Sequence, residues 1–198
     1  MIYLSRHGET VWNRAGRLQG TLDSPLTLKG MRQAERIGKC ILKELDGRKV
    51  ARFVSSPLGR ARQTAAIIAD VLDLDAHGID TDERLREASF GSWGGLLMDE
   101  VVRAHASCWE ARLADRWTVA PPGGESYRDV AQRLQDFIDE HSGLEGGGEV
   151  TILVAHGLAN RVLRGLILGA PPEEFMSYDE PQDGFYELAE GRERFIEA

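Results

Sequence analysis

The chain has 198 residues, which is enough for one domain with a single hydrophobic core and short for two. Its net charge of −8 argues against general binding of nucleic acid or anionic membranes, although a few arginines can still form a small basic pocket. The two cysteines, Cys40 and Cys108, form neither a disulfide framework nor a zinc pattern, so we expect packing residues. No apolar stretch of about 20 residues and no signal segment is seen, and we expect a cytoplasmic protein.

Sequence patterns in the first half alternate between strands and helices. They predict a strand at residues 2–5, a loop at 13–25, a helix from Thr27 to Leu45, a strand at 51–55 and a short strand at 79–81. Thr27 has the side chain of a helix N-cap. Ser56 and Pro57, directly after the second strand, predict the N-cap and first residue of the next helix.

The second half continues this alternation and ends in a hairpin. It predicts an irregular helical segment at residues 96–117, a helix at 126–141, a flexible turn at 146–148, a strand at 150–155, a helix at 157–168 and a hairpin at 184–198 that turns at Glu190 and Gly191. The strand at 150–155 is nearly all apolar, as is typical of a central strand covered on both faces. We therefore predict an α/β fold. Residues 1–198 form a single domain with a mostly parallel central sheet, helices on both faces and an antiparallel edge.

Several predicted strand and helix ends carry residues suited to phosphate chemistry. Arg6 and His7 follow the first strand, Arg60 lies in the first turn of the helix after the second strand, Glu87 lies in a loop after the third, and His156 ends the central strand. In a parallel sheet such positions open on the same edge, where ligands bind.

These residue types can together perform phosphoryl transfer. Arginine guanidinium groups match phosphate oxygens, and a helix N-terminus adds oriented N–H groups. A neutral imidazole can attack phosphorus, and a protonated carboxyl group can donate a proton to the leaving alkoxide. The cluster therefore predicts a site in which arginines, rather than a metal, stabilise the charge of the transferred group.

Each residue alone has a plainer interpretation. A lone histidine after a strand is more often structural, Arg60 can be a surface charge, and Glu87 can be an ordinary exposed carboxylate. Two histidines and a carboxylate also form a known iron triad, but the neighbouring arginines repel a divalent cation and no H-E-x-x-H spacing occurs. We expect no metal, and the joint occurrence of these residues is what makes the signal specific.

Five segments resemble, in order, the motifs of the histidine phosphatase superfamily, in its phosphoglycerate mutase-like branch. The first comprises residues 6–10 with Trp12, Asn13, Gln19, Gly20 and 23–27; the others are residues 55–65, residues 85–87 with 90–93, residues 123–126 and residues 154–157. They span nearly the whole chain, and a chance match to all five is very improbable.

The resemblance implies a role for each matching residue and no cofactor. His7 matches the nucleophile that becomes phosphohistidine, and Glu87 matches the proton donor. Arg6, Arg60 and His156 match the phosphate pocket and complete the catalytic set. Substrate-binding roles near the phosphoryl group are implied for Asn13, Gln19, Gly20, Thr21 and Gly157.

The chain departs from the mutases of this family in ways that favour a phosphatase. Met98 ends a Leu-Leu-Met run where mutases carry Leu-Asn-Lys, and Glu110 and Ala111 stand where mutases carry paired arginines. The mutase insertion and C-terminal tail also have no counterpart. Gly94 replaces a frequent glutamate, which affects the local loop rather than the chemistry.

We therefore predict a metal-independent phosphomonoester hydrolase that acts through phospho-His7. Phosphoglycerate mutase, or a phosphate-binding regulatory module without turnover, stays as an alternative. The expected partner is a small phosphorylated metabolite, not nucleic acid or a membrane, and a homodimer stays open. Residues 96–120, with Trp109, Trp117 and Met98, are expected to cover the site and to set the choice of substrate.

Overall fold

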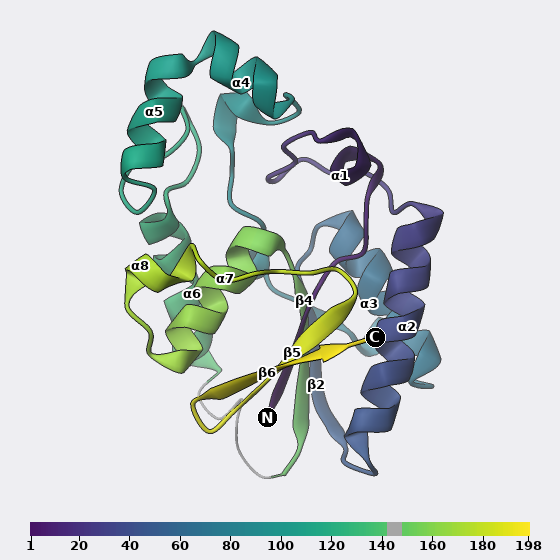
Figure 1. Ribbon diagram of the computed structural model, residues 1–198. Coiled ribbons are helices and arrows are strands. Elements are labelled where there is room, and N and C mark those ends of the chain that lie inside the picture. Colours follow the sequence, from purple (N-terminus) through teal and green to yellow (C-terminus); the bar gives the residue numbers. More distant parts are fainter. Residues whose placement is uncertain (142–147) are drawn as a thin grey trace.

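One mixed sheet organises the protein, whose computed structural model describes residues 1–141 and 148–198 (Figure 1). The strands lie in the order β3-β2-β4-β1-β5-β6. Their bounds are β1 Ile2–Arg6, β2 Val50–Ser55, β3 Asp80–Thr81, β4 Val150–Ala155, β5 Gly184–Ala189 and β6 Arg192–Glu197. Pairs among β3, β2, β4 and β1 are parallel, whereas β5 and β6 form an antiparallel edge. The predicted sheet, including its terminal hairpin, is confirmed.

Helices cover both faces of this sheet, as predicted. Their bounds are α1 Val11–Ala15, α2 Leu28–Leu45, α3 Gly59–Val71, α4 Met98–Ala104, α5 Ala106–Ala114, α6 Tyr127–Glu140, α7 Gly157–Leu168 and α8 Pro172–Phe175. Short 3₁₀ turns lie at Ala76–Gly78, Glu83–Leu85 and Gly91–Trp93. Thr27 caps α2, since its hydroxyl accepts a hydrogen bond from the Gly30 N–H at 3.0 Å.

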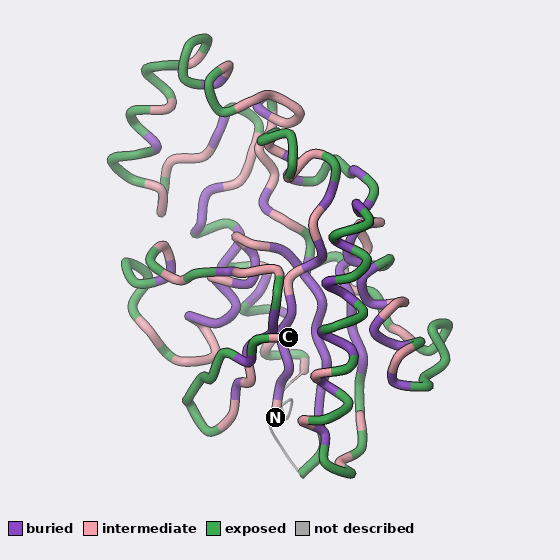
Figure 2. Tube along the Cα trace, turned by 45° about the vertical axis from the view of Figure 1, so that its right-hand side comes forward, coloured by how far each residue is buried: buried purple, intermediate pink, exposed green. Residues whose placement is uncertain are grey.

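The central strands are buried on both sides, and alternate side chains enter different cores (Figure 2). On β1, Tyr3 packs with Ile37 and Ile41 of α2 and with residues of α3. Leu4, the next residue, packs in the opposite core with Leu134 of α6 and residues of α7. Burial on two faces explains why these strands read as continuous apolar runs.

Strands β1 and β4 are neighbours whose following helices lie on opposite faces of the sheet. The chain leaves β1 toward α2, which belongs to the core around Tyr3, and leaves β4 directly into α7, which belongs to the core around Leu4. The carboxyl ends of such a pair open a crevice that no helix fills. This crevice is where the candidate site lies.

Helices α4 and α5 stand apart from the sheet, above its carboxyl edge (Figure 1). Their segment leaves and rejoins the body of the protein at one point. There the Glu125 N–H donates to the Ser89 carbonyl at 2.9 Å, and the Ser89 N–H donates to the Glu125 carboxylate at 2.8 Å. Arg133 of α6 holds the same carboxylate at 2.9 Å.

Three local predictions were wrong. Helix α3 begins at Gly59 rather than at Pro57, because Leu58 keeps an extended backbone and Asp23, from a distant loop, accepts the Arg60 N–H at 3.3 Å. The predicted loop at 13–25 overlaps helix α1, which has a capping box between Thr10 and Asn13. Cys108 is exposed on α5, so it is not a packing residue. In the predicted turn at 146–148, residues 146 and 147 lie outside the described residues.

Candidate active site

The two predicted histidines meet at the crevice between β1 and β4. His7 directly follows β1 and His156 directly follows β4, and their ring centroids are 5.2 Å apart. Both side chains are almost completely buried. The parallel register of the two strands, in which Arg6 lies opposite Ala155, brings together residues that are 149 positions apart in the sequence, counted from His7 to His156.

The imidazole of His7 has a defined tautomer. Its Nδ1 lies 2.8 Å from the Gly8 carbonyl oxygen, which can only accept, so Nδ1 carries the proton. Its Nε2 lies 3.2 Å from Nε of Arg60, which can only donate, so Nε2 holds the lone pair. Burial, followed by the charges of Arg60 and Arg6, holds the pKa of His7 well below its ordinary value of 6.5. His7 is therefore neutral at pH 7 with an unprotonated Nε2.

Arg60 is buried and positions both the histidine and a loop. Besides His7, its guanidinium donates to the carbonyl oxygens of Gly20 and Leu22, each at 2.7 Å, and to Asp23 at 3.1 Å. These four bonds occupy four of the five N–H groups of the side chain. One N–H stays available for a phosphate oxygen unless the loop moves.

Arg6 has more donors to offer. One Nη donates to the Glu180 carbonyl at 2.8 Å, whereas the buried Nε has no protein partner among the described residues. Gly157 makes room for this guanidinium, because a Cβ at that position would lie 3.3 Å from Arg6 Cζ. The glycine after the second histidine therefore has a steric role beside Arg6.

Gln182 is a site residue that the sequence did not reveal. Its amide donates to the His7 carbonyl at 3.0 Å and to the Asn13 side-chain oxygen at 3.2 Å. It lies in the loop before β5, which has no recognisable motif, and only the folded chain brings it beside the first strand. It fixes the backbone of the histidine and the orientation of Asn13 together.

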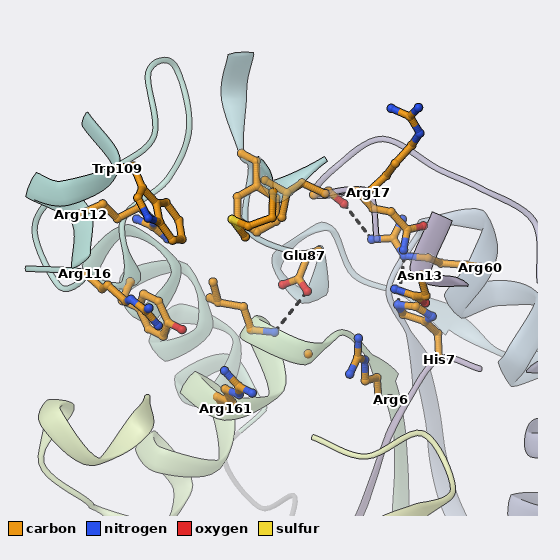
Figure 3. A pocket seen from close by; sticks show the side chains of 18 residues that line it. Arg6, His7, Asn13, Arg17, Arg60, Glu87, Trp109, Arg112, Arg116 and Arg161 are labelled. Atoms are coloured by element: carbon orange, nitrogen blue, oxygen red, sulfur yellow. Dashed lines mark hydrogen bonds between the residues drawn. The ribbon is translucent and has the colours of Figure 1, made fainter. Parts of the chain in front are cut away.

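Glu87 lies at the N-terminus of α7. Its carboxylate accepts N–H bonds from Leu158 at 3.2 Å, from Ala159 at 3.1 Å and from Ala88 at 2.9 Å. The helix end therefore holds a carboxylate of the protein itself. Glu87 still lines the pocket, beside Arg6 and His7 (Figure 3).

His156 lies behind the pocket rather than in its wall. Its Nε2 is 2.7 Å from the Ser56 hydroxyl, and its buried Nδ1 has no partner within residues 1–141 and 148–198. Burial, with the charges of Arg60, His7 and Arg6, holds its pKa well below 6.5. The predicted phosphate-binding role requires that this ring or its neighbours shift when a ligand arrives.

The pocket at this sheet edge has a volume of about 360 Å³. Most predicted site residues line it: Arg6, His7, Asn13, Gln19, Gly20, Arg60, Glu87 and Gly157. Thr21 is exposed and does not line it, so only the Gln19–Gly20 part of that loop faces a ligand. Gly20 has a φ of +55°, a conformation that glycine adopts without strain.

The far end of the pocket contains residues that the sequence analysis had not assigned. Arg112 and Arg116, at and after the end of α5, and Arg161 of α7 line it, as do Trp109 and Met98 (Figure 3). The expectation that residues 96–120 border the site is thus confirmed for Trp109 and Met98, whereas Trp117 does not line the pocket and packs against Phe175, with 6.0 Å between ring centroids. Trp93 is instead a buried packing residue, 6.0 Å from the Trp109 ring between centroids. Spacing could have revealed Arg161, because it lies one helical turn after Gly157 and therefore on the same face of α7.

The described residues contain neither a metal cluster nor a membrane-spanning helix. Among the described residues, no cluster of three or more His, Cys, Asp or Glu side chains is arranged to hold a metal ion. None of the helices in the described part of the chain has the length and apolar character needed to cross a membrane.

Comparison with known proteins identifies the family. The model of the histidine phosphatase superfamily (branch 1) matches residues 2–195. A probable phosphoglycerate mutase, GpmB, of Yersinia pestis is 36% identical over 171 residues, which are 86% of this chain and 75% of that protein.

Solved structures share the fold over almost the full length. The mycobacterial glucosyl-3-phosphoglycerate phosphatase complexed with VO3 has a TM-score of 0.81 and 31% identity, covering 99% of this chain and 96% of that one. The α-ribazole phosphatase of Shigella flexneri has a TM-score of 0.84 and 24% identity, covering 99% and 94%, and supports the fold alone. With its motifs in order and its site residues gathered at one sheet edge, the chain belongs to branch 1 of the histidine phosphatase superfamily.

Proposed function

We propose that this protein hydrolyses phosphomonoesters through a phosphohistidine at His7, without a metal ion. The observation that carries the proposal is the tautomer of His7, whose Nε2 lone pair lies beside two arginines. A neutral imidazole held in this way is a nucleophile. The name of the mycobacterial glucosyl-3-phosphoglycerate phosphatase, which is 31% identical to this chain, supports the same reaction class.

In the first step, the Nε2 lone pair of His7 attacks phosphorus and the bond from phosphorus to the ester oxygen breaks. The carboxyl group of Glu87 gives its proton to the departing alkoxide, which leaves as an alcohol. Arg6 and Arg60 bind the equatorial oxygens, and Arg60 exchanges its bond to Nε2 for one to phosphate.

In the second step, water attacks the phosphohistidine. The Glu87 carboxylate accepts a proton from this water, the bond from phosphorus to Nε2 breaks, and inorganic phosphate leaves with His7 neutral again. The same carboxyl group therefore serves as acid and then as base, which returns the enzyme to its starting state.

Trapping experiments test the proposal. Brief incubation with a ³²P-labelled phosphomonoester should leave label on His7 that is stable in base and lost in acid, because protonation of a phosphorylated imidazole expels phosphate. A regulatory module without turnover would bind phosphate but acquire no covalent label. Absence of label under conditions of measured hydrolysis would remove the phosphohistidine route.

A mutase is the second candidate, and two structural observations favour it more than the sequence did. Arg112, Arg116 and Arg161 supply cations at the pocket, and helices α4 and α5 lie above it. A mutase needs both, to hold a second phosphate and to exclude water from the phosphoenzyme. Interconversion of 3- and 2-phosphoglycerate, measured by coupling to enolase with 2,3-bisphosphoglycerate present, should be negligible beside phosphate release. Mutase turnover equal to the best hydrolysis would reverse this choice.

A further inference from the structure

The far end of the pocket holds three arginines without an anionic partner. Arg112 and Arg116 approach it from α5 and the turn that follows, and Arg161 approaches it from α7 (Figure 3). Within residues 1–141 and 148–198, no carboxylate oxygen lies within 4.0 Å of any of these guanidinium groups. The chain has 32 acidic residues against 24 basic ones, so this lack does not follow from composition.

Three other arginines with little exposed side chain are closely paired. Arg84, Arg133 and Arg164 each have a carboxylate at 2.6 to 2.9 Å, and Arg84 and Arg164 have two each. Charged groups that leave water are normally matched in this way, because an unmatched charge in a protein interior is costly. The buried Arg112 is the clearest contrast to that rule, and Arg116 and Arg161 are half-buried without a carboxylate partner in the described residues.

Burial and mutual repulsion make the contrast sharper. Arg112 is only 4% exposed, and in the described structure its Nη1 donates to the Val119 carbonyl at 2.6 Å. Burial lowers its pKa, and the nearby charge of Arg116 lowers it further. Arg161 likewise lowers the pKa of Arg6, and its own buried Nε has no partner in the described structure. A bound anion would relieve this repulsion.

Apolar and aromatic side chains also line the pocket, namely Leu18, Phe90, Met98, Trp109, Tyr127 and Leu158, and Trp109 lies beside Arg112 (Figure 3). Glu87 is the one carboxylate among the lining residues, against six arginines. The pocket therefore offers cationic groups at each end, with Glu87 between them and apolar side chains in the rest of its wall (Figure 3).

We infer that the substrate is a phosphomonoester with a second anionic group, a carboxylate or a second phosphate. Arg116 and Arg161 bind that group, Arg112 supports them from the buried wall, and the ester phosphate faces His7. The inference rests on the proposed function, because it assumes that the end at His7 receives the reacting phosphoryl group. By this inference, the far end binds a part of the substrate that takes no part in the reaction.

Binding of phosphonates, which cannot be hydrolysed, tests the inference without turnover. Calorimetric titration should compare ω-phosphonocarboxylates of increasing chain length with their neutral amides, and with the corresponding bisphosphonates. At the best length, the acid or the bisphosphonate should bind at least tenfold more tightly than the amide, and the tighter of the two identifies the second group. Equal affinity of acid, bisphosphonate and amide at every length would overturn the inference.

Arginine variants show which side chains bind the second anionic group. Arg116→Gln and Arg161→Gln should each reduce the preference for the anionic ligand to about threefold or less while leaving the affinity for the amide within twofold. Arg32→Gln, on the exposed face of α2, is the matched control and should keep the full preference. Circular dichroism checks folding, and a preference unchanged in both pocket variants would also overturn the inference.

Turnover separates this inference from the proposed function. Hydrolysis of 4-carboxyphenyl phosphate and 4-carbamoylphenyl phosphate should differ at least tenfold in kcat/KM, in favour of the acid. Hydrolysis of both at equal rates, with equal phosphonate binding, would leave the phosphatase proposal intact and remove the second anion. Tight binding of the anionic phosphonate without hydrolysis of any ester would instead support the second anion site and contradict the phosphatase proposal.

Discussion

The two ends of the pocket differ in how firmly their residues are held. At the end near His7, the side chains that hold the nucleophile already have partners: Arg60 makes four hydrogen bonds, His7 two, and Gln182 joins His7 to Asn13. The buried Nε of Arg6 and Nδ1 of His156 have none in the described structure. At the far end, the Arg116 and Arg161 side chains make no hydrogen bond within the described residues, and the supporting helix α5 has one buried residue. The end at His7 is therefore the more firmly preorganised of the two, whereas a ligand would complete the far end.

This difference separates chemistry from selection. Groups that stabilise a developing charge work best when they are already in place, because they need no reorganisation during the reaction. Groups that choose between substrates need only a favourable contact once the ligand is bound. Disturbing the end at His7 should therefore reduce kcat, whereas disturbing the far end should mainly change KM.

The largest expected effect is at the nucleophile. His7→Asn should lower turnover by about a thousandfold or more for every ester, because no neighbouring group can replace Nε2. The exposed His77→Asn, in the turn Ala76–Gly78, is the matched control and should be fully active. Steady-state phosphate release measures both. Residual activity of more than a few per cent in His7→Asn would contradict the assignment.

Next in size is the effect of removing the proton donor. Glu87→Gln should lower kcat/KM for alkyl phosphates by roughly 10²- to 10⁴-fold, because the alkoxide then leaves unprotonated. The loss for p-nitrophenyl phosphate should be much smaller, since its phenolate needs little protonation. Glu83→Gln, an exposed neighbour, serves as control. Equal losses on both esters would show that Glu87 is not the acid.

A smaller effect is expected at the far end. Trp109→Ala should raise KM for aryl phosphates several-fold, a change of about 1 kcal/mol from lost apolar contact, with kcat nearly unchanged. Leu113→Ala lies on the same helix, is 48% exposed and does not line the pocket, so it should have no effect. A fall in kcat matching that of the site variants would mean that the two ends do not act separately.

Stability should respond to acid through the buried histidines. Because burial holds the pKa of His156 below 6.5, the unfolded chain takes up a proton below pH 6.5 that the folded protein does not. The free energy of unfolding should therefore fall as pH decreases below 6.5, by up to about 1.4 kcal/mol per pH unit for each such histidine. His156→Asn should reduce the slope of unfolding free energy against pH by the share of one histidine, up to about 1.4 kcal/mol per pH unit. Urea unfolding between about pH 7.5 and 5.5 measures it, and parallel curves would contradict it.

No effect at all is expected from chelation. Activity should survive excess EDTA, because Arg6 and Arg60 provide the charge stabilisation that a metal would otherwise supply. Orthovanadate should inhibit, since it can adopt the five-coordinate geometry of the transferred phosphorus. Loss of activity in EDTA, restored by a divalent ion, would overturn metal independence.

The sequence predicted the fold and the end at His7 because both depend on short, regular patterns. Strands buried on two faces read as apolar runs, and parallel strands bring their carboxyl ends together, so Arg6, His7 and His156 could be placed from their positions alone. Periodicity and the capping residue Thr27 were equally informative for α2.

What escaped prediction depends on contacts between distant segments. Gln182 acts through a loop that has no pattern. Asp23 lies in the first motif, but its contact with the start of α3, which shifts that helix to Gly59, could not be read from the sequence. The arginines of the far end were missed because comparison with mutases looked for cations at positions 98 and 110–111. The fold supplies them from Arg112, Arg116 and Arg161 instead.

Ser89 and Glu125 are hydrogen-bonded to each other, so residues 90–124 form one continuous segment that begins and ends at the same place in the fold. Both ends of this stretch are fixed at one place, so its length and composition can vary at a small entropic cost to the rest of the domain. It carries α4, α5 and two of the far-end arginines, but none of the residues proposed to act on phosphorus. New substrate preferences can thus arise by replacing one continuous piece of chain while the reaction is inherited unchanged.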